Sequence, residues 1–250
     1  MQIAFVINDR FCPAGIVEDV VAERGHDIVV LYPHEGDPLP VDIPDAWGGL
    51  VAFGGRMHAY QDETYPALAD VARLISTAHK TGLPYLGVCL GAQQLARALG
   101  EERMHMDVGE FGLVPMKATD LGRSDPLMKG LDLPAVMQVH EDNFHVPQGA
   151  ELLLTSGAST VQGVRVGPTT YGFQCHFEVN DADCETWINM LEDQFIHLMN
   201  AEQVETLRAT RAEFQTRLPA AQAFGRELTR RWLDLAHVRR SHLEQTQAVS

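Results

Sequence analysis

Residues 83–100 of the chain are LPYLGVCLGAQQLARALG, and this stretch indicates the fold around it. It begins as a short apolar run of the kind found in a buried strand. It ends with two leucines at helical spacing, and Gly100 stops the helix. Residues 87–91 join the two parts with the pattern Gly-x-Cys-x-Gly. The stretch therefore predicts a strand that turns sharply into a helix at a cysteine.

Cys89 occupies that turn. A side chain at such a corner stands exposed above the sheet, and flanking glycines permit the tight backbone and leave room for a substrate. The first N–H groups of the new helix point at the same place, which favours a negative charge there. A buried structural cysteine is the alternative, but the two glycines favour a nucleophile. We therefore treat Cys89 as a candidate nucleophile.

The overall composition restricts the class of protein. The 250 residues are 45% hydrophobic, as in ordinary globular chains, and their net charge of −15 argues against binding to nucleic acids or anionic membranes. The N-terminus lacks the basic start and apolar core of a signal peptide, and no apolar run approaches the roughly 20 residues of a membrane helix. We expect a cytoplasmic protein with neither a nucleic-acid nor a membrane partner.

The cysteines and histidines give no sign of a metal or of a disulfide framework. The four cysteines show neither zinc-type spacing nor the density of a disulfide-rich chain. His105, His140 and His145 have no recognised ligand spacing. The chain also lacks a glycine-rich phosphate loop. We therefore expect no metal and no cofactor.

The first half of the chain alternates strands with helices, which predicts a mostly parallel sheet covered on both faces. Ligands of such sheets bind at the carboxyl ends of the strands. Gly54 and Gly55 end one strand and Cys89 ends another, so they are expected on one rim. The expected strands are 3–7, 27–32, 49–53 and the strand before Cys89, and the expected helices are 13–24 and 65–80.

The second half of the chain has a different sequence pattern, in which short strand candidates follow one another with few helices between them. We therefore expect antiparallel strand pairing there. A helix over 181–200 and two further helices on either side of Pro219 follow. We divide the chain into residues 1–199 and a helical extension, 200–250, which could pack on the main domain or form a homodimer. The strand candidates are 111–117, 135–140, 151–155, 160–166 and 170–175.

A nucleophile needs a base, an orienting group and donors for an oxyanion. His176 and Glu178 share one face of an extended segment and could be base and orienting group. A surface histidine followed by a helix-start glutamate remains the alternative. The donors would be the N–H of Leu90 and an N–H from Gly54 or Gly55, unless the two glycines serve only as a tight turn.

Three segments together resemble a known family. Residues 87–93 (GVCLGAQ), 53–55 (FGG) and 172–178 (GFQCHFE) resemble, in order, the nucleophile, oxyanion and His-x-Glu motifs of class I (triad-type) glutamine amidotransferases. The resemblance covers about residues 1–195. Residues 125–131 and 140–144 further resemble a stand-alone branch similar to the glutaminase part of GMP synthase.

The resemblance implies a flavodoxin-like α/β fold with an open, mostly parallel sheet flanked by helices. It also implies that Cys89 attacks the γ-amide of a glutamine-like substrate to form a γ-glutamyl thioester. His176 would then carry protons, and Glu178 would orient His176.

The resemblance also suggests a substrate-binding set. Gln93 matches the family glutamine that helps to hold the amino-acid end of the substrate. His140 and Asp142 fall near the loop that completes the pocket.

The chain departs from the family pattern beside the catalytic histidine. Cys175 stands where phenylalanine is usual, Phe177 where proline is usual, and Val139 where tryptophan is frequent. Cys175 is expected to be a small core residue, because neighbours along a strand face opposite sides. The departures suggest an altered leaving-group or acceptor side with the triad intact.

Three functions therefore compete. The preferred one is a stand-alone hydrolase of glutamine or a γ-glutamyl amide. The second is a glutaminase subunit that delivers ammonia to a separate synthetase, since the chain contains no synthetase domain. The third is a non-catalytic binding protein, which the intact residues Cys89, His176 and Glu178 argue against.

Overall fold

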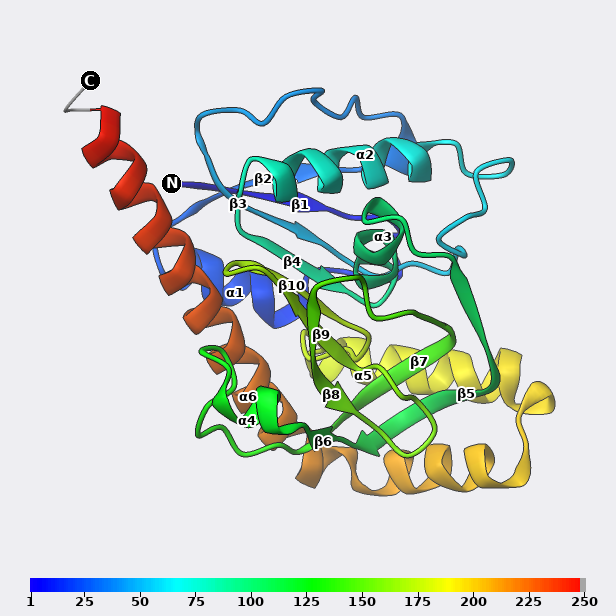
Figure 1. Cartoon of the computed structure of the whole chain (residues 1–250). Coiled ribbons are helices and arrows are strands. Elements are labelled where there is room, and N and C mark those ends of the chain that lie inside the picture. Colours follow the sequence, from blue (N-terminus) through cyan, green and yellow to red (C-terminus); the bar gives the residue numbers. More distant parts are fainter. Residues whose placement is uncertain (248–250) are drawn as a thin grey trace.

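An eight-stranded sheet forms the centre of the molecule (Figure 1). Its strands are β1 (Gln2–Val6), β2 (Asp27–Leu31), β3 (Trp47–Ala52), β4 (Tyr85–Val88), β6 (Lys117–Ala118), β8 (Ala150–Thr155), β9 (Gly163–Val166) and β10 (Thr170–Phe173). In this computed structural model, which describes residues 1–247, they lie in the order β2-β1-β3-β4-β10-β9-β8-β6. The strands from β2 to β10 in that order run parallel, and β9, β8 and β6 pair antiparallel. The expected α/β sheet is confirmed.

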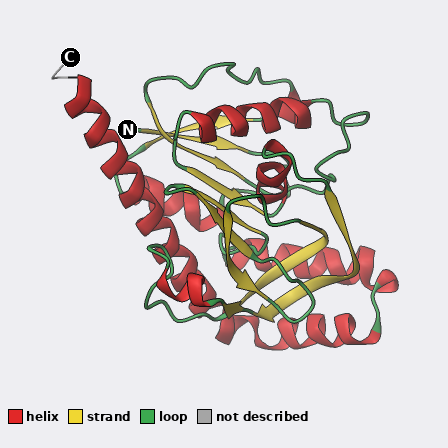
Figure 2. Ribbon diagram, in the orientation of Figure 1, coloured by secondary structure: helices red, strands yellow, loops and turns green. Residues whose placement is uncertain are grey.

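Helices cover both faces of this sheet (Figure 2). They are α1 (Gly15–Glu23), α2 (Ala67–Lys80), α3 (Leu90–Ala98), α4 (Asp120–Ser124), α5 (Asp181–Met190) and α6 (Ala201–Gln247), with short 3₁₀ turns at Pro33–Glu35 and Ile196–Leu198 and a π-helical turn η2 at Leu191–Phe195. Successive side chains of β1 point to opposite faces of the sheet. Ile3 and Phe5 pack with α1 and α6, whereas Ala4 and Val6 pack with α2. None of the helices in the described range is long and apolar enough to cross a membrane.

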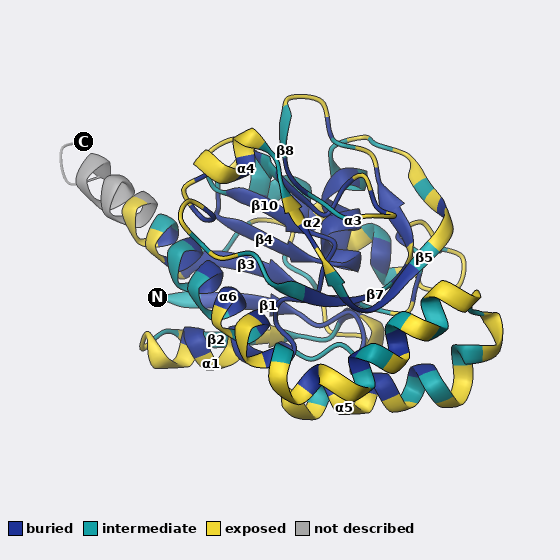
Figure 3. Ribbon diagram, turned by 90° about the horizontal axis from the view of Figure 1, so that it is seen from below, coloured by how far each residue is buried: buried dark blue, intermediate teal, exposed yellow. Residues whose placement is uncertain are grey.

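The end of the chain corrects one expectation. Residues 201–247 form a single helix, α6, with Pro219 inside it, and not two helices. Figure 1 shows the two halves of α6 running in different directions, which is the bend that an internal proline causes. The helix continues because its second half is buried: Trp232 lies in the core and its N–H donates to the carbonyl of Tyr85 at 3.2 Å. Figure 3 shows the buried side of α6 against the body of the molecule.

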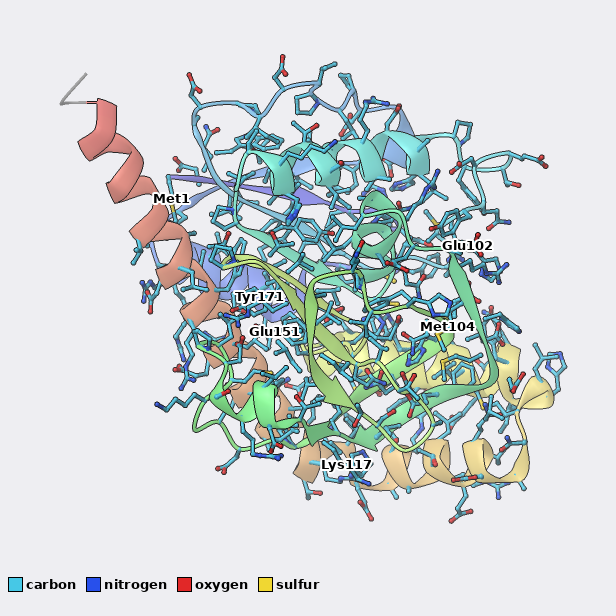
Figure 4. The ribbon with its side chains drawn as sticks, viewed as in Figure 1. Met1, Glu102, Met104, Lys117, Glu151 and Tyr171 are labelled. Atoms are coloured by element: carbon cyan, nitrogen blue, oxygen red, sulfur yellow. The ribbon has the colours of Figure 1, made fainter. Side chains whose placement is uncertain are left out.

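A separate two-stranded ribbon joins β5 (Arg103–Pro115) to β7 (Ala135–Phe144). Figure 4 labels Glu102 and Met104, at the start of this ribbon, on the side of the molecule opposite Met1. The ribbon therefore begins toward the carboxyl ends of the parallel strands. It also reaches the segment after β10, since the N–H of His176 donates to the carbonyl of Met137 at 2.9 Å.

Candidate active site

Cys89 lies at the sharp turn between β4 and α3. Its φ of 50° and ψ of −109° make it the sole non-glycine residue with positive φ in the described range. Its neighbours explain the glycines of the motif: a Cβ on Gly91 would lie 2.0 Å from the carbonyl oxygen of Ala52, and one on Gly87 would lie 2.8 Å from the Gly91 backbone. The glycines thus allow α3 to start directly against the sheet, with the strained cysteine at its N-terminus.

His176 and Glu178 follow β10, the strand that pairs with the cysteine strand. Nδ1 of His176 donates to Oε1 of Glu178 at 2.7 Å, and both side chains are buried. Burial lowers the pKa of an imidazole, but the charge of Glu178 and the charge and hydrogen bond of Cys89 outweigh it and raise the pKa of His176 to about 10. The three side chains named from the sequence therefore lie together, with the imidazole between the other two.

Two glycines from other parts of the chain pack closely against the backbone of the segment 176–178. A Cβ on Gly15 would lie 2.0 Å from the carbonyl oxygen of Glu178, which accepts the N–H of Ile16 at 2.8 Å. A Cβ on Gly225 of α6 would lie 2.0 Å from the carbonyl oxygen of Phe177. Both helices therefore approach the His176 segment as closely as only glycine permits.

The predicted oxyanion donors lie around the cysteine. Leu90 begins α3, and a Cβ on Gly55 would lie 2.8 Å from its side chain. A Cβ on Gly54 would lie 3.1 Å from Cε1 of His176, so Gly54 also adjoins the imidazole. Within the described range, the N–H groups of Gly55 and Leu90 form no hydrogen bond. Two donors beside the thiol are therefore available to a ligand.

Gln93 connects the cysteine helix to the ribbon. Its amide nitrogen donates to the backbone carbonyl of Asp142 at 3.2 Å and to Oε1 of Gln174 at 3.1 Å. The amide nitrogen of Gln174 lies 3.4 Å from the sulfur of Cys89. Gln174 was not singled out from the sequence, although it lies inside the quoted motif at 172–178.

Asp142 lies in the same pocket as Gln93, but its carboxylate is already engaged. Arg103 donates to both oxygens at 2.9 and 2.8 Å, and the Nδ1 atoms of His58 and His105 lie 2.6 and 3.0 Å away. Burial raises the pKa of Asp142, but these hydrogen bonds outweigh it and lower the pKa. The aspartate therefore ties three cationic or polar side chains to the rim of the pocket.

His140 also borders the pocket, but both ring nitrogens have partners. Nδ1 lies 3.1 Å from the carbonyl of Asp142, and Nε2 lies 3.1 Å from Oε1 of Gln138 and 3.3 Å from Oε2 of Glu110. His140 is 5% exposed. Its geometry suits it to hold the backbone of β7 at Asp142, so the loop expected here from the sequence is part of a strand.

The pocket has a volume of about 190 Å³ and opens beside Cys89 and His176. Much of its lining is apolar and comes from α5 and the π-helical turn. Val139, one of the departures noted in the sequence, also lines it, whereas Cys175 and Phe177 are buried in the core. The apolar side chains from α5 and η2 are Trp187, Met190, Leu191 and Phe195.

Sequence reasoning did not identify the side chains that pack around the imidazole of His176. Trp187 packs edge-on against His176 with ring centres 4.6 Å apart, and Cys12 lines the same pocket. Trp187 lies in the helix expected over 181–200, and nothing in the sequence links it or Cys12 to the site. Burial raises the pKa of the Cys12 thiol well above its usual value, so that thiol is neutral.

Comparison with known proteins identifies the family of the chain. Residues 19–198 match the family model described as glutamine amidotransferase class-I, and the chain belongs to that family. It is similar to the glutamine amidotransferase-like protein YfeJ of Salmonella typhimurium, with 30% identity over 183 residues that cover 71% of this chain and 76% of YfeJ. It is also 30% identical to a subunit of the glutamine-hydrolysing GMP synthase of Sulfurisphaera tokodaii, over 67% of this chain and 86% of that protein.

Solved structures extend the likeness to nearly the whole chain. A glutamine amidotransferase from Thermotoga maritima superimposes with a TM-score of 0.78 and 26% identity, over 93% of this chain and 97% of that one. A match to the GMP synthase of Candida glabrata covers only 29% of that longer protein. The family and fold expected from the sequence are therefore confirmed.

Proposed function

We propose that the protein is a cysteine-dependent hydrolase that cleaves the γ-amide of glutamine or of a γ-glutamyl compound and releases glutamate with ammonia or an amine. The observation that carries the proposal is a series of three adjoining groups, of which Cys89 and His176 line the pocket and Glu178 lies behind His176. Cys89 lies at a strained turn, His176 adjoins it, and Glu178 lies 2.7 Å from the far nitrogen of the imidazole. A thiol, an imidazole and a carboxylate in this order suit nucleophilic acyl transfer.

The reaction follows from these groups. The thiol of Cys89 passes its proton to His176 as the sulfur attacks the substrate carbonyl carbon and forms a C–S bond. The C–N bond then breaks as His176 gives this proton to the departing nitrogen. A water next transfers a proton to His176 as its oxygen attacks the thioester carbonyl; the C–S bond breaks, His176 returns the proton to the sulfur, and glutamate leaves. Glu178 keeps the imidazole in orientation and stabilises its charged form.

The other predicted residues have supporting roles in this proposal. The N–H groups of Leu90 and Gly55 stabilise the oxyanion, and Gly54 leaves space beside His176. Gln93 and Asp142 form the polar part of the pocket that takes the amino-acid end of the substrate. His140 acts indirectly, by holding the backbone of Asp142.

The test is release of glutamate by the purified protein alone, from glutamine and from γ-glutamyl amides. Cys89→Ala is expected to reduce turnover by at least about 10³-fold while its circular dichroism spectrum stays native. Cys184→Ala is the matched control, because it removes another buried thiol outside the pocket lining and should retain activity within about threefold. Equal activity of Cys89→Ala and the parent would refute the assignment of the nucleophile.

A glutaminase subunit remains the second candidate, because a GMP synthase subunit of Sulfurisphaera tokodaii is among the relatives. It predicts little glutamate release until a synthetase is added. We also propose residues 1–199 as the amidotransferase-like domain and 200–250 as its helical extension. A homodimer through α6 stays a prediction, and sedimentation of the full chain would test it.

A further inference from the structure

The place of the leaving group follows from the proton that it must receive. In the proposed reaction His176 protonates the departing nitrogen, so the amine has to lie against the imidazole. Nδ1 of that ring is bound to Glu178, which leaves Nε2 as the nitrogen that faces the reaction. The side chains around the exposed side of His176 therefore decide which amines can leave.

Aromatic and aliphatic side chains surround that position. Trp187 packs edge-on against His176, with ring centres 4.6 Å apart and planes at 80°. Met190, Leu191 and Phe195 continue the same wall of the pocket from the end of α5 through η2. A π-helical turn shifts the side chains that follow it around the helix and is frequent at functional sites. Here it carries two of the residues of this wall.

The four side chains of this wall (Trp187, Met190, Leu191 and Phe195) carry a single polar group, and it is already paired. The indole N–H of Trp187 donates to the carbonyl of Phe11 at 2.8 Å. The guanidinium of Arg56, elsewhere in the pocket lining, is bound to Asp9 at 2.7 Å and lies 4.1 Å from the centre of the Phe11 ring. The four side chains of the wall therefore offer neither a cation nor a free donor to a charged amine substituent. An apolar substituent, by contrast, would find aromatic faces and a thioether of the kind that bind rings well.

We propose that the substrates are γ-glutamyl amides of apolar aromatic amines, with the aromatic part of the amine bound between Trp187, Met190 and Phe195. This inference rests on the proposed hydrolase function and adds the substrate class to it. Glutamine, whose leaving group is ammonia, would leave this wall unfilled. An amine that carries a carboxylate would place its charge against these apolar side chains, none of which can pair with it, and this is unfavourable.

The test compares amides whose leaving amines differ in size and not in chemical reactivity. The probes are glutamine, γ-glutamyl methylamide, γ-glutamyl benzylamide and γ-glutamyl-4-aminobutyrate. The alkyl amines leave with similar ease, so differences in kcat/KM report contacts with the wall. The benzylamide is expected to exceed the methylamide by about tenfold or more, and the aminobutyrate compound to fall below the benzylamide by at least as much.

Substitutions test whether the preference for the benzylamide arises from contacts with the aromatic wall. Phe195→Ala is expected to lower kcat/KM for the benzylamide about tenfold and to leave the methylamide within about twofold. Leu198→Ala is the matched control, because Leu198 follows on the same segment, is 65% exposed and lies outside this pocket. It should change neither substrate. Binding of the benzylamide and the methylamide to Cys89→Ala protein, measured by calorimetry, should show the same preference without turnover.

The outcomes separate the two proposals. Turnover of glutamine or the methylamide with no advantage for the benzylamide would overturn the substrate class and leave the hydrolase proposal standing. A benzylamide preference that survives in Phe195→Ala would overturn the location. A folded protein that hydrolyses none of the four compounds would overturn the hydrolase proposal and the substrate class with it.

Discussion

Two buried histidine–carboxylate pairs lie beside the same pocket. In one, His176 binds Glu178 through Nδ1 at 2.7 Å and adjoins Cys89. In the other, His140 contacts Glu110 through Nε2 at 3.3 Å. Both imidazoles are less than a tenth exposed, so burial and a nearby carboxylate do not distinguish them.

The two pairs differ in whether the histidine keeps a ring nitrogen that the rest of the protein does not bind. His140 has partners on both nitrogens, and both oxygens of Glu110 are bonded, one to Ser156 at 2.5 Å and the other to Gln162 at 2.6 Å. His176 uses Nδ1 for Glu178, and its other nitrogen is left to the thiol of Cys89. A histidine can pass protons to a ligand only through a nitrogen that the rest of the protein leaves open. This difference supports the proposal that His176 transfers protons and that His140 has a positioning role.

The largest expected contrast is in activity. His176→Gln is expected to lower kcat/KM for the best γ-glutamyl substrate by at least about 10³-fold, because the nucleophile loses its base. His140→Gln should raise KM by about tenfold or less and leave kcat nearly unchanged, since it loosens only the Asp142 backbone. Steady-state kinetics of the two variants measure this, and equal losses of kcat would abolish the distinction.

The two carboxylates should differ next. Glu178→Gln keeps the shape of the side chain but removes the charge that fixes the imidazole, so kcat is expected to fall by about 10²- to 10⁴-fold. The same substitution at Glu110 should lower kcat by less than about tenfold, because Glu110 touches no reacting group. A kcat for Glu178→Gln near that of the parent would remove this residue from the mechanism.

For the stability of the fold, the order of the two carboxylates should be reversed, with Glu110 the more important. Glu110→Ala removes the acceptor of two short hydrogen bonds, from Ser156 and Gln162, and is expected to lower the free energy of unfolding by about 2–3 kcal/mol. Glu178→Gln retains an acceptor for Nδ1 of His176, so near pH 10 and above, where the imidazole is neutral, it should cost about 1 kcal/mol or less. Urea denaturation of the two proteins measures the difference. A larger loss for Glu178→Gln would show that the catalytic pair is the structural one.

The last contrast is a pair of opposite pH dependences. The pKa of His176 is raised to about 10 from 6.5, so the stability it contributes is complete below about pH 6.5 and lost as the pH rises toward 10. Burial raises the pKa of Glu110, but hydrogen bonds from His140 and Ser156 outweigh it and lower the pKa below 4.5. Its contribution is therefore present above pH 4.5 and lost in acid. Thermal unfolding against pH should show the alkaline slope reduced in His176→Gln and the acid slope reduced in Glu110→Gln.

The sequence sufficed for the local parts of the site. The turn at Cys89 depends on glycines two residues away on either side, and the approach of Glu178 to His176 depends on a spacing of two, so both are visible in short motifs. The alternation of strands and helices likewise predicted the parallel sheet. These features need no knowledge of distant partners.

The parts that join distant segments were beyond such patterns. Trp187 packs against His176, and Cys12 lines the same pocket from a distant part of the chain; nothing local marks either of them. The expectation of a helix break at Pro219 was wrong because burial of residues such as Trp232 outweighs the hydrogen bond that proline removes. Tertiary packing decided these features.

The close approach of Gly225 to Phe177 has a consequence for the order in which the site forms while the chain is synthesised. Chains leave the ribosome N-terminus first, and domains fold as they emerge. The segment that carries His176 and Glu178 can meet Gly15 early, but it gains its contact with Gly225 only after residues well beyond it have been made, since α6 extends to Gln247. A chain made only as far as β10 can form the turn at Cys89, but it lacks this second support of the His176 segment. The proposed site is therefore expected to reach its final geometry late in synthesis.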